Sequence, residues 1–297
     1  MLLFDVVIPT FNNLNELKNC LDSFSNQTIK DYRIYVCVDG STDGTVEYLK
    51  QVADINTQLF FLEHSDQRNH GRGAALNLAL PYLSAKYILF IDSDFVVKNS
   101  FLQDHFELLK KKDVVSMGLI VYQKGNIWRD YDVTRGLHQF KTDFAVLPFN
   151  YMVTSNTAMP SNIFSDLKGF DEKIIAYGGE DTDLAIRIWD RFQIKTILNK
   201  KAAVFGKLEK PLLFALKQRE EFAKNNLKYI MEKHPNAPPI FRSDRIQSFW
   251  GKTLFRLIPQ KALLRCAESA FVPQFLKLRI VHLLVFYHLC RGLYSKS

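Results

Sequence analysis

The sequence is poor in cysteine and contains no internal repeat and no low-complexity tract. Its four cysteines, Cys20, Cys37, Cys266 and Cys290, lack the close spacing typical of metal sites, and Cys37 lies inside an apolar run. We therefore expect buried or inert thiols and a reducing compartment. The first ten residues, MLLFDVVIPT, lack the basic start and the uninterrupted apolar stretch of a secretory signal. The expected location is the cytoplasm.

Charge is distributed unevenly along the chain. Residues 1–206 hold 22 Lys and Arg against 25 Asp and Glu, whereas residues 207–297 hold 17 against 6. The net charge of +8 therefore arises from the last third of the sequence. Such a basic segment can bind a membrane surface, nucleic acid or an acidic polymer, and charge alone does not decide between them. Nucleic acid is the weakest of the three, because no recognition motif accompanies the charge.

Apolar runs alternate with helical patterns in the first third of the chain. With 47% hydrophobic residues, the 297-residue chain can bury one large core. Short apolar runs predict buried strands at 4–8, 34–38, 59–62 and 87–91. Helical spacing follows the first run, and another helix is expected at 74–82. This alternation predicts an α/β fold with a mostly parallel, twisted sheet flanked by helices.

The later sequence is less regular. A helix is expected at 101–112 and a strand at 114–122, whereas residues 123–151 are polar, aromatic and irregular, as in a substrate-facing insertion that contacts an acceptor. The remaining pattern predicts helices at 211–233, at 246–270 with an interruption at Pro259, and at 275–294. We expect one large domain, 1–206, followed by a basic amphipathic helical extension, 207–297.

Carboxylates follow two of the predicted strands. Asp39 comes directly after one, and Asp92 and Asp94 come after another. In open α/β sheets, ligands bind beyond the carboxyl ends of the strands. Because side chains alternate in an extended segment, Asp92 and Asp94 can face one ligand, and such hard oxygen ligands suit Mg²⁺ or Mn²⁺ on a nucleotide diphosphate. A solvated turn is the alternative interpretation of this short motif.

Asp39 and the Glu180–Asp181 pair each have two interpretations. Asp39 can accept a hydrogen bond from a base or a ribose, while Ser41 and its two neighbours, 42–43, are also explained as the start of a helix. Glu180 and Asp181 open a helix, where acids complement the macrodipole. Adjacent carboxylates also repel each other, so one can have a raised pKa, as a general base requires.

A loop at residues 68–73 has some features of a phosphate-binding loop. It contains Arg68, His70 and Arg72 but lacks the full glycine pattern of a dinucleotide site or a P-loop. Both arginines can contact phosphate or remain solvated surface charges.

Six motifs in order give the sequence a family resemblance. They are VVIPTFNNLNELKNCLDSF, VCVDGSTDGT, GRGAALNLAL, FIDSDF, TSNTAMPSNIFSDLKGFDE and YGGEDTDLAIRI. Together they resemble the family two nucleotide-sugar glycosyltransferases, which have an A-type, Rossmann-like fold. The resemblance covers roughly residues 3–206, and residues 148–188 are similar to the chondroitin-polymerase and galactosyltransferase-like branch.

The resemblance implies an inverting enzyme that transfers a sugar from a nucleotide diphosphate donor, expected to be a UDP-sugar, to a hydroxyl of a glycan or lipid-linked saccharide. In that interpretation Asp181 is the general base, Glu180 binds a sugar or acceptor hydroxyl, and Asp94 ligates Mn²⁺ or Mg²⁺. Asp39 accepts from the base and Asp92 lies near the ribose or donor sugar. The implied nucleotide-sugar-binding set is Pro9, Thr10, Phe11, Asp39, Ser41, Arg68, Arg72, Asp92 and Asn156.

The sequence departs from the family pattern at two places. Leu76 precedes Asn77 where relatives often have Arg, and Arg68 or Arg72 can compensate. Residues 203–206, AVFG, lack the His that relatives use as a further metal ligand. Solvent and Glu209 can fill that place, metal binding can be weak, or turnover can be lost. The last case defines the alternative function, a catalytically silent scaffold that binds nucleotide or glycan.

The C-terminal pattern of interleaved apolar and basic residues also has two interpretations. The longest apolar stretch, Ile280–Cys290, is too short for a bilayer, which needs about 20 residues. A helix lying in the interface of an anionic membrane fits the pattern, and so does a helical bundle packed on the catalytic domain. The first hypothesis predicts peripheral attachment to the cytoplasmic face of the membrane, within reach of a lipid-linked acceptor.

Overall fold

The computed structural model describes residues 2–240 and 243–294. Contacts along the chain divide it into two compact units. The first unit holds the chain up to Val121, Phe140–Ile175 and Glu180–Gly206. The second holds Tyr122–Gln139, Ala176–Gly179 and the chain from Lys207 onward. Residues 122–139 and 176–179 thus join the segment that the sequence analysis assigned to a C-terminal extension.

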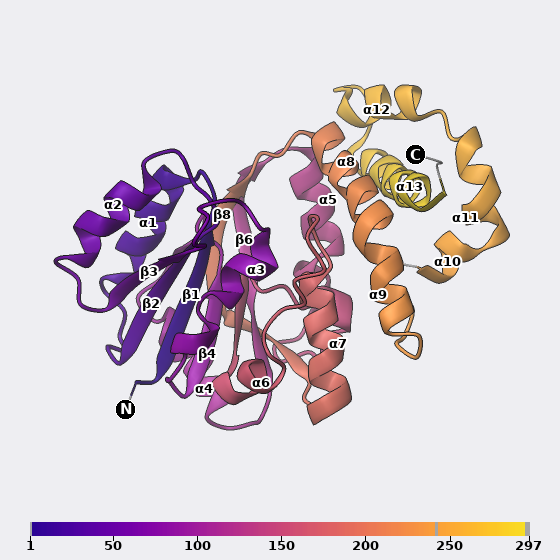
Figure 1. Cartoon of the computed structure of the whole chain (residues 1–297). Helices are drawn as coiled ribbons and strands as arrows, with labels where there is room; N and C mark the ends of the chain where they lie inside the picture. Colours follow the sequence, from indigo (N-terminus) through magenta and orange to yellow (C-terminus); the bar gives the residue numbers. More distant parts are fainter. Residues whose placement is uncertain (1, 241–242, 295–297) are drawn as a thin grey trace. The chain divides into compact units, whose positions relative to one another are not determined.

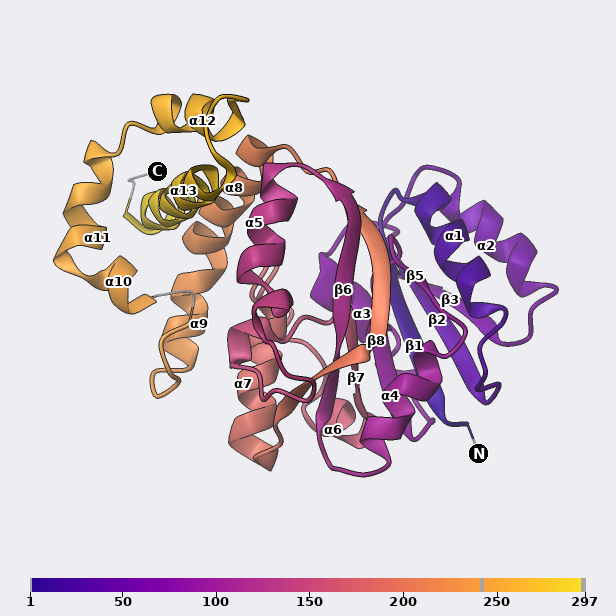
Figure 2. The ribbon, with the colours of Figure 1, turned by 180° about the vertical axis from the view of Figure 1, so that it is seen from behind.

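A sheet organises the first unit (Figure 1). Within the described residues it has eight strands in the order β3-β2-β1-β4-β7-β6-β8-β5. Their bounds are β1 Phe4–Thr10, β2 Tyr32–Val38, β3 Leu59–Glu63, β4 Tyr87–Ile91, β5 Val96–Val97, β6 Val115–Gly125, β7 Asn156–Pro160 and β8 Thr196–Leu208. Figure 2 shows β6, β7 and β8 together in the half of the sheet that comes later in the chain.

The two halves of the sheet differ in strand direction. β1 pairs in parallel with β2 and β4, and β2 pairs in parallel with β3. β7 runs antiparallel to β4 and β6, and β5 runs antiparallel to β8. The α/β prediction is confirmed, with parallel pairing among the first four strands and antiparallel pairing at β7 and β5. Regular strand-helix alternation ends at β4, and beyond it the connections no longer impose parallel crossovers.

Helices cover the sheet and enclose its core. They are α1 Leu14–Phe24, α2 Thr45–Ala53, α3 Arg72–Asn77, α4 Phe101–Leu109, α6 Ser161–Asp166 and α7 Glu180–Phe192, with 3₁₀ turns at Leu80–Tyr82 and Phe149–Tyr151. α1 and α2 lie side by side in both views. One cluster of buried side chains joins β1, β2, β4 and β7 to α3, α6 and α7, and includes Val7, Leu76, Phe90, Phe164 and Leu184. Burial of these side chains fixes the three helices on the sheet.

Several predicted elements have different bounds in the structure. β1 continues beyond the predicted strand 4–8 through Pro9 and Thr10, which pair with Cys37 and Val38. The helix expected at 74–82 ends at Asn77. Cys20, Cys37 and Cys290 are buried, whereas Cys266 is exposed.

The second unit is helical. It comprises α5 Ile127–Arg135, a 3₁₀ turn Leu137–Gln139, α8 Leu212–Phe222, a π turn Ala223–Leu227, α9 Lys228–Lys233, α10 Ser243–Gln247, α11 Phe249–Thr253, a 3₁₀ turn Leu254–Leu257, α12 Gln260–Glu268 and α13 Gln274–Tyr294. Its core includes Trp128, Leu216 and Leu284. No helix of the described segments has both the length and the apolar character needed to cross a bilayer.

The helix α5 corrects the prediction that residues 123–151 are irregular. Asn126 caps it, because the Asn126 side chain accepts a hydrogen bond from the backbone N–H of Trp128. An Asn before an apolar residue is a recognised helix start. The polar and aromatic composition of the segment hid this signal.

Asp5 supports the start of the first unit. This fully buried carboxylate accepts hydrogen bonds from Arg33 Nη2 at 2.8 Å and from the backbone N–H groups of Ser84 and Ala85 at 2.7 and 2.8 Å. It therefore ties β1 to β2 and to the turn that precedes β4.

We predict that Asp5→Asn lowers the free energy of unfolding by about 3 kcal/mol, because an amide cannot accept all of these bonds and leaves buried donors unpaired. Urea denaturation at neutral pH measures the change. The exposed Asp31, changed to Asn, serves as the control and should shift stability by less than about 0.5 kcal/mol. Equal effects of the two substitutions would contradict the role given to Asp5.

Candidate functional site

Four segments of the first unit bring polar side chains to one edge of the sheet. Asp92 follows β4, and Thr154 precedes β7, which pairs with β4 in the opposite direction. Arg72 begins α3, and Glu180 and Asp181 begin α7. Because β4 ends where β7 begins, residues distant in the sequence meet at this edge.

Arg72 lies at the centre of the group. Its Nη2 donates to Asp92 Oδ1 at 2.7 Å and its Nη1 donates to Thr154 Oγ1 at 2.7 Å. The same Nη1 is 3.4 Å from Glu180 Oε1 and 3.4 Å from Asp181 Oδ1. Thr154 in turn donates its hydroxyl proton to Asp181 Oδ1. We call these five residues, Arg72, Asp92, Thr154, Glu180 and Asp181, the arginine cluster.

The arginine cluster holds one cation against three carboxylates. Burial raises the pKa of Glu180 to about 7, and neighbouring Asp181 adds to this effect while Arg72 opposes it. Burial also raises the pKa of Asp181, whereas the guanidinium of Arg72 and the hydroxyl of Thr154 lower it. Burial alone would lower the pKa of Arg72, but Asp92, Asp181 and Glu180 raise it above its ordinary value. One proton on the Glu180–Asp181 pair near neutral pH relieves part of the excess negative charge.

Glu180 has spare hydrogen-bonding capacity. Among the described residues its Oε2 has no hydrogen-bond partner although it is buried. A buried polar atom without a partner is costly, and a ligand hydroxyl can remove that cost. The observation fits the predicted contact with a sugar or acceptor hydroxyl.

Asp39 secures the loop at residues 68–71. Its two carboxylate oxygens accept hydrogen bonds from the backbone N–H groups of His70 at 2.7 Å and Gly71 at 3.1 Å. Gly40 adopts a φ of +75°, and a Cβ on it would lie 2.7 Å from the carbonyl carbon of Arg68. A glycine is therefore required where the two loops meet. Each Asp39 oxygen retains a second lone pair for a ligand.

The residues expected at the nucleoside lie at the end of β1 and on the loops that follow β1 and β2. Ser41 accepts a hydrogen bond from the backbone N–H of Asn12 at 3.0 Å, and Phe11 is 51% exposed. Thr10 is buried and Pro9 is partly buried. The structure thus joins the loop after β1 to the loop after β2 and leaves the Phe11 ring free to stack.

Asp94 is exposed and lies on the turn between β4 and β5. The segment 203–206 of β8 runs beside this turn, since Phe205 pairs with Val96. A Cβ on Gly206 would be 3.2 Å from the Asp94 carbonyl oxygen. This chain therefore has a small residue, Gly206, next to Asp94. The described residues include no group of three or more His, Cys, Asp or Glu side chains that could hold a metal ion.

Two predicted residues, Asn156 and Arg68, lie outside the arginine cluster. Asn156 is fully buried, and its Nδ2 donates to the carbonyls of Ala202 and Leu119. Its side chain thus belongs to the core and not to an open pocket. Arg68 is exposed, so of the two candidate arginines only Arg72 enters the cluster. Leu76, the residue that departs from the family pattern, is fully buried in the core.

Comparison with known proteins decides the family. The sequence model of Glycosyl transferase family 2 matches residues 5–166, and that of Glycosyl transferase family group 2 matches residues 87–291. The chain belongs to glycosyltransferase family 2. The resemblance described from the six motifs is therefore confirmed.

Curated relatives match the chain over short regions. Glycosyltransferase GlyA of Streptococcus pneumoniae is 38% identical over 109 residues, which are 37% of this chain and 15% of GlyA. Chondroitin synthase of Pasteurella multocida is 34% identical over 92 residues, 31% of this chain and 9% of the synthase. The uncharacterized glycosyltransferase MJ1057 of Methanocaldococcus jannaschii is 28% identical over 193 residues, 62% of this chain and 64% of MJ1057. The chain thus spans less than two thirds of each relative.

Solved structures share the fold over nearly the whole chain. The mannosyltransferase PcManGT of Pyrobaculum calidifontis, in complex with GDP-Man and Mn²⁺, matches with a TM-score of 0.69 at 17% identity, over 99% of this chain and 88% of that protein. TarS 1–349 of S. aureus matches with a TM-score of 0.59 at 17% identity, over 98% of this chain and 90% of that protein. The A-type fold is confirmed.

Thr154 is the member of the arginine cluster that the sequence interpretation missed. It lies in the TSN segment that also contains Asn156, the residue predicted to contact the sugar. Threonine is common before strands, and nothing in the local sequence shows that its hydroxyl meets residues 72 and 181. Only the folded sheet brings these three segments together.

The raised pKa of Glu180 predicts how this family 2 protein responds to pH. The folded protein binds the Glu180 proton more tightly than the unfolded chain, whose ordinary pKa is 4.5. Proton binding to Glu180 therefore stabilises the folded protein fully below pH 4.5, and this stabilisation is lost as the pH rises through about 7.

Glu180→Gln should not show this loss, because Gln does not titrate. The free energy of unfolding of the variant minus that of the parent should therefore be about 2 kcal/mol larger at pH 8 than at pH 4.5. Urea denaturation at both pH values measures the difference. The exposed Glu47, changed to Gln, is the control and should show no such trend. If the difference in free energy of unfolding between Glu180→Gln and the parent stays constant with pH, burial does not raise the pKa of Glu180.

Proposed function

We propose that this protein is an inverting glycosyltransferase that transfers a sugar from a UDP-linked donor to a hydroxyl of a glycan or lipid-linked saccharide. The observation that carries the proposal is the arginine cluster, which joins Asp92, expected on the donor side, to Asp181, expected on the acceptor side, through one guanidinium. Donor and acceptor groups must meet at one carbon atom for a single displacement.

Asp181 is the general base in this proposal. It removes the proton from the acceptor hydroxyl while that oxygen forms a bond to the anomeric carbon of the donor. The bond from this carbon to the diphosphate oxygen breaks, and the nucleoside diphosphate leaves with the electron pair. Because the attack comes from the side opposite the leaving group, one displacement inverts the anomeric centre. Glu180 Oε2 would bind a hydroxyl of the sugar or of the acceptor.

Residues on the donor side would bind the nucleotide diphosphate. Asp39 would accept from the base, Phe11 would stack on it, and Arg72 would exchange part of its carboxylate contacts for diphosphate oxygens. Solved relatives support a nucleotide-sugar donor, since TarS has been crystallised with UDP and with UDP-GlcNAc, and PcManGT with GDP-Man and Mn²⁺.

Asp94 would hold the divalent cation, Mn²⁺ or Mg²⁺. Its exposed carboxylate offers the hard oxygen that these ions prefer, and diphosphate oxygens and water suit the remaining positions because Gly206 offers no imidazole. When bound, the ion supplies positive charge to the leaving diphosphate. Positive charge at the diphosphate would then come from the cation held by Asp94 and from the guanidinium of Arg72.

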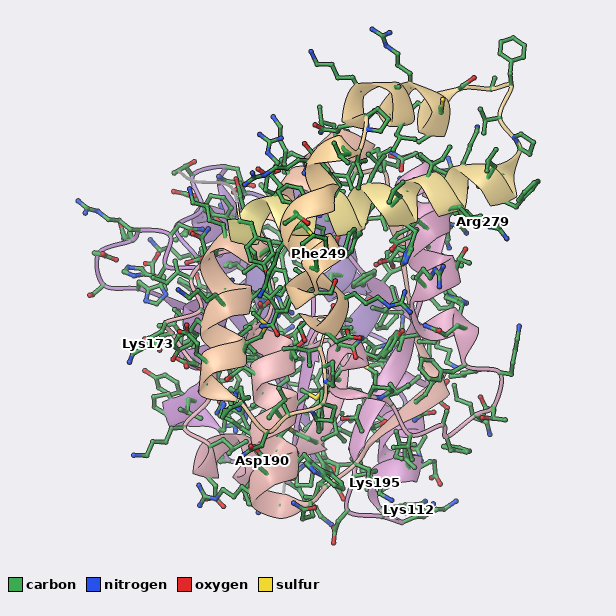
Figure 3. The ribbon with its side chains drawn as sticks, turned by 90° about the vertical axis from the view of Figure 1, so that its right-hand side faces the viewer. Lys112, Lys173, Asp190, Lys195, Phe249 and Arg279 are labelled. Carbon is green, nitrogen blue, oxygen red and sulfur yellow. The ribbon has the colours of Figure 1, made fainter. Side chains whose placement is uncertain are left out.

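We predict that Asp181→Asn lowers turnover by at least about 100-fold, because an amide cannot accept the proton, while the Kd for UDP changes less than about twofold. A thermal-shift screen of UDP-GlcNAc, UDP-glucose and GDP-mannose with Mn²⁺ first identifies the donor. Release of the nucleoside diphosphate, with a lipid and glycan extract as acceptor, then measures turnover. Asp190→Asn, on the exposed distal part of α7 (Figure 3), is the matched control and should keep parental turnover.

Retained turnover in Asp181→Asn would move the base to another residue. Tight nucleotide binding by the parent protein without any release of product would instead favour the silent scaffold.

We further propose that the second unit attaches this enzyme to an anionic membrane surface. Phe271 and Phe275, in and after the turn that joins α12 to α13, are 97% and 64% exposed. Exposed basic residues lie on the same two helices, which pack against each other: Lys261, Arg265 and Arg279, the last labelled in Figure 3. Exposed aromatics beside cations suit the interface of a bilayer with anionic headgroups.

Replacing both Phe271 and Phe275 with Ser should lower the partition coefficient onto phosphatidylglycerol-containing vesicles at least about tenfold, because two apolar rings no longer leave water. Co-sedimentation measures the partition, with vesicles of phosphatidylcholine alone as the lipid control. Ile55→Ser, which changes an 84% exposed side chain of the first unit, is the protein control. If the parent protein stays in solution with both lipids, membrane attachment is wrong.

A further inference from the structure

Thr154 lies inside the arginine cluster without any assigned role. It is fully buried, and its hydroxyl lies between two charged groups. Arg72 Nη1 donates to Thr154 Oγ1 at 2.7 Å, and Thr154 Oγ1 donates to Asp181 Oδ1. A guanidinium has no lone pair and can only donate, so the single hydroxyl proton is committed to Asp181. The direction of this short chain of hydrogen bonds is thereby fixed.

We propose that Thr154 is the positioning residue for the general base, with its hydroxyl holding the Asp181 carboxylate in one orientation toward the acceptor. The inference rests on the proposed role of Asp181 in sugar transfer. Arg72 and Thr154 both contact Oδ1, so the carboxylate is held through that one oxygen. A base fixed in this way loses less freedom when the acceptor binds.

The backbone that carries Thr154 is itself anchored. Its neighbour Ser155 accepts a hydrogen bond from the backbone N–H of Asp92, and Asn156 pairs with Ile91 of β4. Asn156 donates to the carbonyls of Leu119 and Ala202, so its Oδ1 is left to accept from His105 Nε2 at 3.0 Å. Burial lowers the pKa of His105 to about 4, so this imidazole is neutral and donates from Nε2.

This anchoring gives Asn156 a role in the structure that differs from the predicted contact with a sugar. Its amide links β6, β7 and β8 within the core, two residues from Thr154. The start of β7 is therefore rigid, and Thr154 can hold Asp181 without moving.

The charged groups that face Asp181 are Arg72, Glu180 and Asp92. Asp92 raises the pKa of Asp181, whereas Arg72 and the Thr154 hydroxyl lower it by stabilising the carboxylate. Removal of the hydroxyl should therefore raise the apparent pKa of the Glu180–Asp181 pair. The acid limb of turnover should move to higher pH, because the base is active only when ionised.

Three variants test the proposal. Thr154→Val removes the hydroxyl at nearly constant volume, and Thr154→Ser retains it. Thr157→Val is the matched control, because Thr157, on β7, is fully buried like Thr154 but donates to the carbonyl of Val153. Should Thr154→Val fail to fold, Thr154→Ala removes the same hydroxyl.

The first measurement is a ¹³C carboxyl NMR titration of the ligand-free protein, with Asp181→Asn and Glu180→Gln used for assignment. Thr154→Val should raise the apparent pKa of the pair by at least about half a unit, while Thr154→Ser and Thr157→Val should titrate as the parent does. Titration in Thr154→Val that matches the parent would overturn the proposal.

The second measurement is the pH profile of UDP release from UDP-GlcNAc, or from the donor that the screen selects. Thr154→Val should lower kcat about 10- to 100-fold at neutral pH and move its acid limb upward, with the Kd for UDP unchanged. A role in packing alone would lower kcat equally at every pH and would damage Thr154→Ser as well, which would also overturn the proposal. Full turnover in Asp181→Asn would instead refute the proposed role of Asp181 as the base, and a parent protein that releases no UDP would refute the proposed function. In both cases the NMR titration would still decide whether Thr154 holds the carboxylate.

Discussion

The site depends on one ionic interaction, in which a single guanidinium bridges three carboxylates. Arg72 reaches Asp92, Glu180 and Asp181, which lie on segments far apart in the sequence. Without this cation, the pKa values of Glu180 and Asp181, which burial already raises and Arg72 lowers, would rise further. The cluster therefore requires that α3, β4 and α7 be held at fixed positions, and the apolar core beneath them does so.

The arginine cluster includes groups whose burial is energetically unfavourable. Glu180 has a pKa raised to about 7 and a buried oxygen without a partner among the described residues, so folding accepts a cost at this edge of the sheet. Fully satisfied groups elsewhere, such as Asp5 with its three donor residues, offset that cost. A site that is short of positive charge is suited to a substrate that brings a cation and new donors with it.

Sequence patterns predicted the parallel strands and the carboxylates at their ends, because buried strands are apolar runs and their termini are sharp. They did not predict which arginine enters the site, since Arg68 and Arg72 look alike until α3 orients one inward. Asn156 was expected beside the sugar, but its amide satisfies carbonyls of two other strands, which are long-range contacts. The antiparallel half of the sheet and the role of Thr154 also arise from pairings distant in sequence, on which local periodicity carries no information.

The central claim is that the arginine cluster and Asp94 surround one metal-bound diphosphate. A crystal structure of the protein soaked with UDP and Mn²⁺, with the ion located by its anomalous signal, tests it most directly. The account predicts a manganese peak at the Asp94 carboxylate, with the diphosphate between it and Arg72. A nucleotide bound elsewhere on the protein, or a manganese peak without contact to Asp94, would contradict it.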